Sequence, residues 1–81
     1  MKALCLREMQ LDQSGTILSV NASGELGRRI RDMGLVPGTE VTVVGRAPLR
    51  DPVALRLRNF TLVLRNSEAD LIQVGVGEDA E

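Results

Sequence analysis

Hydrophobic and polar residues alternate along two neighbouring stretches in the second half of the chain, residues 53–57 and 60–65. Alternation with a period of two is typical of β-strands that bury one face. The inner face would hold Val53, Leu55 and Leu57 from the first stretch, and Phe60, Leu62 and Leu64 from the second. Asn59 lies between the stretches and favours a turn, so the pattern predicts a β-hairpin.

Three further short stretches rich in β-branched residues predict strands at residues 16–20, 40–47 and 71–74. Gly45 falls inside the second of them and indicates a bulge. The segment from Pro48 to Pro52 predicts a loop, because proline lacks the N–H group that a sheet requires. Residues 66–70 predict a single capped helical turn.

One main helix is predicted from Ser23, which can cap the first turn, to about Met33. Gly34 follows directly and is placed to end the helix in the left-handed conformation. Gly27 lies inside the helix, where glycine costs about 1 kcal/mol relative to alanine. It indicates either the close approach of another backbone segment or a tolerated weakness.

The helix carries one apolar stripe, because Leu26, Ile30 and Met33 recur at helical spacing. We expect these three residues, together with Leu35 and Phe60, to belong to the hydrophobic core. Arg28, Arg29 and Arg31 lie off the stripe and face outward.

Five short strands with one helix after the first indicate a mainly β fold with one main helix. The expected architecture is a small five-stranded antiparallel barrel, with the helix between strands 1 and 2. Closing the sheet would remove its open edges. We expect residues 1–76 to form a single domain and the acidic residues 77–81 to form a flexible tail.

The composition excludes several chemistries. The 81 residues include no histidine, which is the usual general acid–base residue and the commonest transition-metal ligand. Cys5 is the only cysteine, so we expect it to pack as a small apolar residue. No phosphate-binding glycine loop and no metal-binding carboxylate spacing occurs. We therefore expect a non-enzymatic intracellular domain with no catalytic residue, no cofactor, no metal site and no transmembrane segment.

Arginine dominates the middle of the chain. Between Leu26 and Arg65, eight basic residues stand against three acidic ones, although the whole chain has a net charge of −1. Guanidinium groups fork onto carboxylates and phosphates, so this region predicts a basic face that meets an acidic or phosphate-bearing partner. The candidate partner-binding residues are Arg28, Arg29 and Arg31 on the helix, and Pro48, Leu49, Arg50 and Asp51 in the loop.

Leu49 is an apolar residue on the expected loop tip. It would either anchor in a pocket of the partner or fold back over the end of the barrel, and the sequence favours neither.

Two segments, GELGRRIRDMGLVPGTEVTV and RAPLRDPVALRLRNFTLVLRNSEADLIQV, resemble the bacterial ferrous iron transport protein A (FeoA) family. The resemblance extends from about Met9 to Val76 and implies an SH3-like fold. It also implies a cytoplasmic accessory role in ferrous iron uptake, without enzymatic activity or an agreed metal site. Arg50 departs from the family pattern, which often has a small residue at this loop position.

The partner that the resemblance implies is the large membrane iron transporter of that system, of the FeoB type. Its cytoplasmic part contains a GTPase domain, and binding to it would recruit this domain to the inner face of the membrane. Binding would modulate the assembly or the activity of the transporter.

Three other interpretations remain open at the level of sequence. One makes Arg29 or Arg50 an arginine finger that stabilises charge during GTP hydrolysis by the partner. Another is a nucleic-acid-binding or regulatory barrel that uses the basic face. The pI near 5.4 and the assignment of Phe60, the only aromatic residue, to the core weigh against it. The third is an iron carrier that uses Cys5 and carboxylates.

Overall fold

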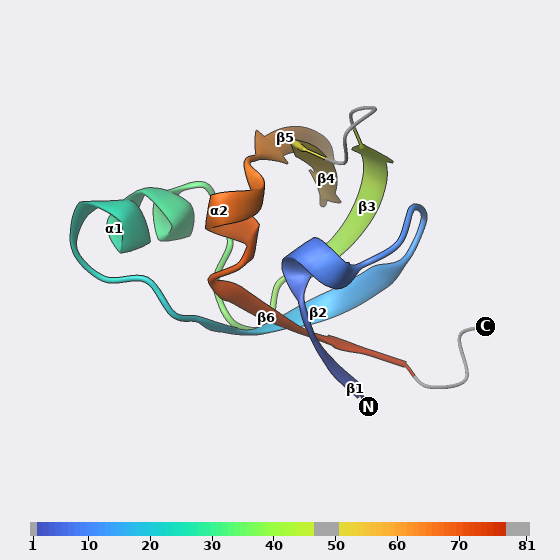
Figure 1. Cartoon of the computed structure of the whole chain (residues 1–81), viewed down its shortest axis with the longest axis horizontal. Helices are drawn as coiled ribbons and strands as arrows, with labels where there is room; N and C mark the ends of the chain where they lie inside the picture. Colours follow the sequence, from blue (N-terminus) through green and yellow to red (C-terminus); the bar gives the residue numbers. More distant parts are fainter. Residues whose placement is uncertain (1, 47–50, 78–81) are drawn as a thin grey trace.

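The computed structural model describes residues 2–46 and 51–77. Within them it contains six β-strands, two α-helices and one short 3-10 helix (Figure 1). In chain order the elements are β1 (Lys2–Cys5), η1 (Leu6–Glu8), β2 (Ser14–Val20), α1 (Gly24–Asp32), β3 (Glu40–Arg46), β4 (Val53–Leu57), β5 (Phe60–Leu64), α2 (Asn66–Ala69) and β6 (Ile72–Val76).

The six strands form one antiparallel sheet in the order β1-β6-β2-β3-β4-β5. β1 and β5 are its edges, and each pairs with a single neighbour among the described residues. The mainly β class with one main helix is confirmed. The expected closed, five-stranded barrel is wrong, because the sheet has a sixth strand and stays open. The main helix α1 therefore lies between the second and third strands, not between the first and second.

The strand that sequence reasoning missed is β1. Its four residues, KALC, have neither strict alternation nor a β-branched side chain, so no local pattern marks them. They are extended because they pair with β6, with Lys2 opposite Val76 and Cys5 opposite Gln73. This strand is formed by a tertiary contact, which often overrides local propensity.

The last strand extends beyond its predicted end at residue 74. β6 lies between β1 and β2, so Gly75 has Ala3 on one side and Thr16 on the other. Both Gly75 and Val76 are buried in this position. Gly75 thus belongs to a central strand, because β1 and β2 pair with it from the two sides.

The predicted hairpin is confirmed. β4 and β5 are joined by a two-residue turn at Arg58 and Asn59, with Leu57 paired to Phe60. The bulge predicted at Gly45 is confirmed too, because the register between β3 and β4 shifts between Val43 and Gly45.

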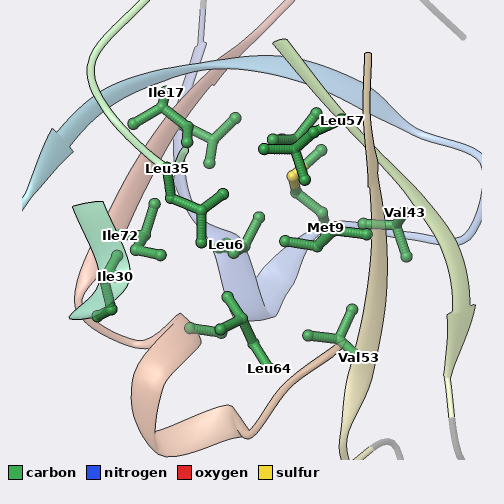
Figure 2. Packing of buried hydrophobic residues seen from close by; sticks show 14 of the residues in the cluster. Leu6, Met9, Ile17, Ile30, Leu35, Val43, Val53, Leu57, Leu64 and Ile72 are labelled. Carbon is green, nitrogen blue, oxygen red and sulfur yellow. The ribbon is translucent and has the colours of Figure 1, made fainter. Parts of the chain in front are cut away.

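The hydrophobic core lies on the concave side of the sheet (Figure 2). Leu6 and Met9, next to η1, point into its centre toward side chains of the sheet. Ile30 is the residue through which α1 enters the core, and it lies beside Ile72. Leu35, which follows the helix, is fully buried as predicted.

Two of the residues assigned to the core are exposed instead. Phe60 is 45% exposed and Leu26 is 37% exposed. Alternation shows which face of a strand a residue occupies, but it does not show whether another element covers that end of the face. Phe60 begins an edge strand beside the turn, and Leu26 lies one helical turn before the buried Ile30. Met33, the third residue of the stripe, is half-buried against the core.

The predicted helix boundaries are confirmed. Ser23 is the N-cap residue of α1, although its side chain makes no capping hydrogen bond. Gly34 has a φ of +96° and lets the N–H of Leu35 donate to the carbonyl of Ile30 at 3.3 Å. Gly27 marks a close approach of backbone, because a Cβ at this position would lie 2.4 Å from the carbonyl oxygen of Ala22.

We predict that Gly27→Ala destabilises the fold by about 1–3 kcal/mol, since the added methyl group would overlap backbone atoms that cannot rotate away. Helix propensity alone predicts the opposite sign, a gain of about 1 kcal/mol. Urea denaturation would measure the change, with Arg28→Ala on the same helix as a control for an exposed site. Increased stability of Gly27→Ala would contradict this account of the packing.

Candidate partner-binding groove

A groove of about 540 Å³ lies between α1 on one side and β5 and α2 on the other. Its residues come from segments far apart in the sequence: Leu26, Arg29, Pro52, Val63, Arg65, Ser67 and Glu68. Figure 1 shows α1 and α2 side by side at the same end of the molecule. The groove contains exposed apolar side chains next to arginines, a combination that suits binding of another protein chain.

The buried carboxylate of Glu68 holds the groove together. Its side chain is only 11% exposed, and a buried charge is stable only where partners replace its water. One oxygen, Oε1, accepts the backbone N–H of Arg65 at 3.0 Å, at the start of α2. The other oxygen, Oε2, accepts a hydrogen bond from Nη2 of Arg29, and the two side chains form an ion pair. Glu68 therefore links α1 to α2 and fixes the guanidinium of Arg29 in the wall of the groove.

Glu68 holds the guanidinium of Arg29, but the side chain of Arg29 remains open to solvent, with 68% of it exposed. A guanidinium carries five N–H donors, and Glu68 engages one of its nitrogens. Its remaining donors are of the kind that bind a carboxylate.

Two side chains give the groove its apolar character. Leu26 lines the α1 side and Val63 the β5 side, where Val63 is 59% exposed. Phe60, on the same strand, does not line the groove, but its ring is exposed and lies close to Gly34 at the end of α1. The alternation along residues 60–65 placed Val63 on the outer face, as the structure has it. Sequence reasoning missed Leu26 and Phe60 as surface groups, because the apolar patterns of helix and strand assigned both to the core.

The structure brings together only part of the predicted partner-binding set. Among the helix arginines, Arg29 lines the groove. Arg28 and Arg31 are exposed but do not line it, and Nη1 of Arg31 lies close to Gly27. The role of all three in binding stays a prediction.

The loop residues Pro48, Leu49 and Arg50 lie outside the described residues. Asp51 is described, and its Oδ1 accepts the N–H of Asn66 at 3.0 Å, which ties the loop to the first residue of α2. Pro52, the next residue, lines the groove. The described end of the loop and Arg29 thus meet at one site.

A second hollow, of about 860 Å³, lies between β1 and the segment before β2. Its charged side chains, Lys2, Glu8 and Asp12, are of mixed sign, and none of the predicted site residues lines it. Its described charged side chains therefore form no patch of a single sign that would attract a charged partner.

Cys5 is partly buried beneath α2, and its thiol lies 3.4 Å from the carbonyl oxygen of Ala69. Burial raises the pKa of the Cys5 thiol, and the nearby Asp70 carboxylate raises it further. The protonated thiol is a poor metal ligand at neutral pH. Among residues 2–46 and 51–77, no three His, Cys, Asp or Glu side chains lie close enough to hold a metal ion. None of the described helices is long and apolar enough to cross a membrane.

Comparison with known proteins identifies one family. The FeoA domain family matches residues 4–76. A fusion of Fe(2+) transport protein A with the Fe(2+) transporter FeoB from Porphyromonas gingivalis is 39% identical over 69 residues, which are 85% of this chain and 8% of that protein. This chain therefore spans a small part of that curated relative.

Solved structures agree with the fold described above. The FeoA-like protein of Clostridium acetobutylicum is 38% identical with a TM-score of 0.88, covering 100% of this chain and 94% of that one. The FeoA of Stenotrophomonas maltophilia, an SH3 domain protein solved with zinc, is 32% identical with a TM-score of 0.77 and 88% coverage of both chains. The expected SH3-like character is confirmed. A manganese-dependent transcriptional repressor is 18% identical with a TM-score of 0.84, covering 95% of this chain and 38% of that one, and shares the fold alone.

We predict that Glu68→Gln lowers the free energy of unfolding by about 1–3 kcal/mol, because the ion pair with Arg29 is lost and the hydrogen bond from the Arg65 N–H is weakened by the loss of charge. The matched control is Asp70→Asn, which removes the exposed pair of Asp70 with Arg7, where the N–O distance is 3.1 Å. That change should cost less than about 1 kcal/mol. Equal losses for the two variants in urea denaturation would show that Glu68 does not hold the groove together.

Proposed function

The chain belongs to the FeoA domain family, and from that membership we propose that it is a non-catalytic accessory protein of bacterial ferrous iron uptake. It binds the cytoplasmic region of an FeoB-type membrane transporter, which contains a GTPase domain, and modulates the assembly or activity of that transporter. The domain works in the cytoplasm and reaches the inner face of the membrane through its partner.

The Porphyromonas gingivalis relative supports this choice of partner. In that protein one chain carries both the transport protein A and the transporter. Joining two domains by a linker raises the concentration of each around the other, so a fusion favours domains that act together. A domain that acts together with the transporter needs a surface that contacts it.

The groove supplies that surface, and the observation that carries the proposal is the ion pair of Arg29 with the buried Glu68. A guanidinium that is already fixed loses little side-chain entropy on binding. The apolar side chains of Leu26 and Val63 lie in the same groove and would be covered by the partner. An acidic and partly apolar surface of the transporter fits these groups best.

The other predicted residues would act around this centre. Arg28 and Arg31 would attract an acidic partner at longer range. Pro48, Leu49, Arg50 and Asp51 would contact the partner from the loop, whose described end borders the groove. As an arginine finger, Arg29 would have to leave Glu68, so we propose that it binds the partner and does not take part in GTP hydrolysis.

Nucleic-acid binding is the second candidate, and one observation favours it. Phe60 is exposed, which removes part of the argument against a base-stacking surface. A single ring provides little stacking area, and the pI near 5.4 opposes a phosphate-binding surface. Binding of this kind would weaken steeply with salt.

Isothermal titration of the full chain into the cytoplasmic GTPase region of an FeoB-type transporter, with and without GTP, tests the proposal. We expect Arg29→Ala to weaken binding about tenfold or more, and Arg31→Ala on the same helix to weaken it far less. Circular dichroism would establish that both variants are folded. Absence of binding in both nucleotide states, or equal effects of the two variants, would contradict the proposal. A gel shift of RNA or DNA at low salt would favour the second candidate.

A further inference from the structure

The outer edge of β5 carries backbone groups that no described segment pairs with. β5 forms a hairpin with β4 through a two-residue turn, so Leu57 and Phe60 exchange both of their backbone hydrogen bonds. The pattern alternates along the ladder, and Leu62 and Leu64 also bond inward to β4. The N–H and C=O groups of Thr61 and Val63 therefore point away from the sheet. No hydrogen bond from another described backbone segment reaches them.

The two edges of the sheet are protected differently. The β1 edge is four residues long and begins with Lys2, and short edges and lysines both discourage the addition of another strand. β5 has five residues, FTLVL, with no charged residue and no proline among them. By these criteria β5 is the edge that accepts a further strand.

The open edge of β5 borders the groove. Val63 and Arg65 line one wall, and Leu26 and Arg29 of α1 line the opposite one. An extended segment laid along β5 would span about 17 Å at the usual rise per residue. Val63 and Arg65 are two residues apart and point to the same face of the sheet, so side chains at every second position of the segment would meet both. Apolar ones among them would contact Val63 and Leu26, and acidic ones would reach Arg29 and Arg65.

Charge favours an acidic segment over a second copy of this chain. Arg58 and Arg65 flank β5, and Arg29 lies on the opposite wall of the groove. A second copy would bring the same arginines, with no acidic residue in its own β5 to pair with them. The carboxylates of an acidic strand would be attracted to these guanidinium groups.

We propose that β5 binds an extended acidic segment of the partner as an additional strand of the sheet, with Arg29 and Arg65 as its carboxylate contacts. The backbone of the segment would bond to Thr61 and Val63, which gives affinity, and the arginines would select for acidic side chains. This inference rests on the proposed function, because it takes the groove to be the partner surface, and it specifies how that surface recognises its partner.

Amide hydrogen exchange measured by NMR on the full chain tests the backbone contact. The probes are an acetylated eight-residue peptide of sequence VTETVTET, which presents valine and glutamate in turn on one face, and, separately, the cytoplasmic region of an FeoB-type transporter. We expect exchange of the Thr61 and Val63 amides to slow at least tenfold on saturation with the peptide. Leu62, already bonded to β4, serves as the internal control. A peptide with lysine in place of glutamate should leave exchange unchanged.

Val63→Pro removes one outward donor while leaving the bonds to β4 in place, and Val63→Ile keeps that donor. We expect Val63→Pro to weaken binding of both probes about tenfold, and Val63→Ile, which alters only the apolar contact, to weaken it far less. If the transporter region binds both variants equally, strand addition is wrong and the proposed function stands. If the peptide binds as expected but the transporter region does not bind, the proposed partner is wrong while the strand contact stands.

Three further outcomes would overturn the inference. Failure of the acidic peptide to bind at millimolar concentration is the first, and equal protection by the lysine peptide is the second. The third is protection of Thr61 and Val63 that rises with protein concentration alone, together with a dimer in sedimentation, which would make a second copy the occupant.

Discussion

The carboxylate of Glu68 is the contact on which the candidate site depends. α1 enters the core through Ile30, and its ion pair with Glu68 joins it to α2. The same carboxylate accepts the N–H of Arg65, at the point where β5 passes into α2. One buried charge therefore positions a helix, a short helix and the end of an edge strand. The buried carboxylate makes this arrangement rigid. If the hydrogen bond to Arg29 or to the Arg65 N–H broke, the charge of Glu68 would lose a partner that water does not replace.

The open sheet explains why the site lies where it does. A closed barrel would bond both edges of every strand and would leave only side chains for recognition. Here the sheet ends at β5, and α1 lies alongside that edge with a groove between them. Backbone groups, apolar side chains and arginines consequently meet in one place. This combination supports the binding of another protein at this end of the sheet.

The sequence was most informative for elements whose structure is determined by neighbouring residues in the chain. The hairpin of β4 and β5, the end of α1 at Gly34 and the bulge at Gly45 follow from alternation and from backbone geometry, and all three are present. It was least informative where a distant segment decides. β1 is extended only because β6 lies beside it, and Phe60 is left 45% exposed by the described elements around its end of the sheet. Arg29 was predicted as a site residue, but its partner Glu68 lies 39 positions away in the chain and no spacing rule connects the two.

Chemical-shift mapping is the most direct test of the claim that the partner binds between α1 and β5. Amide spectra of the labelled full chain would be recorded during titration with the cytoplasmic region of an FeoB-type transporter. The account predicts that the largest shifts cluster in residues 26–29 and 60–68, which surround Glu68. Shifts confined to β1 and the segment before β2 would place the partner at the other end of the molecule and contradict the account.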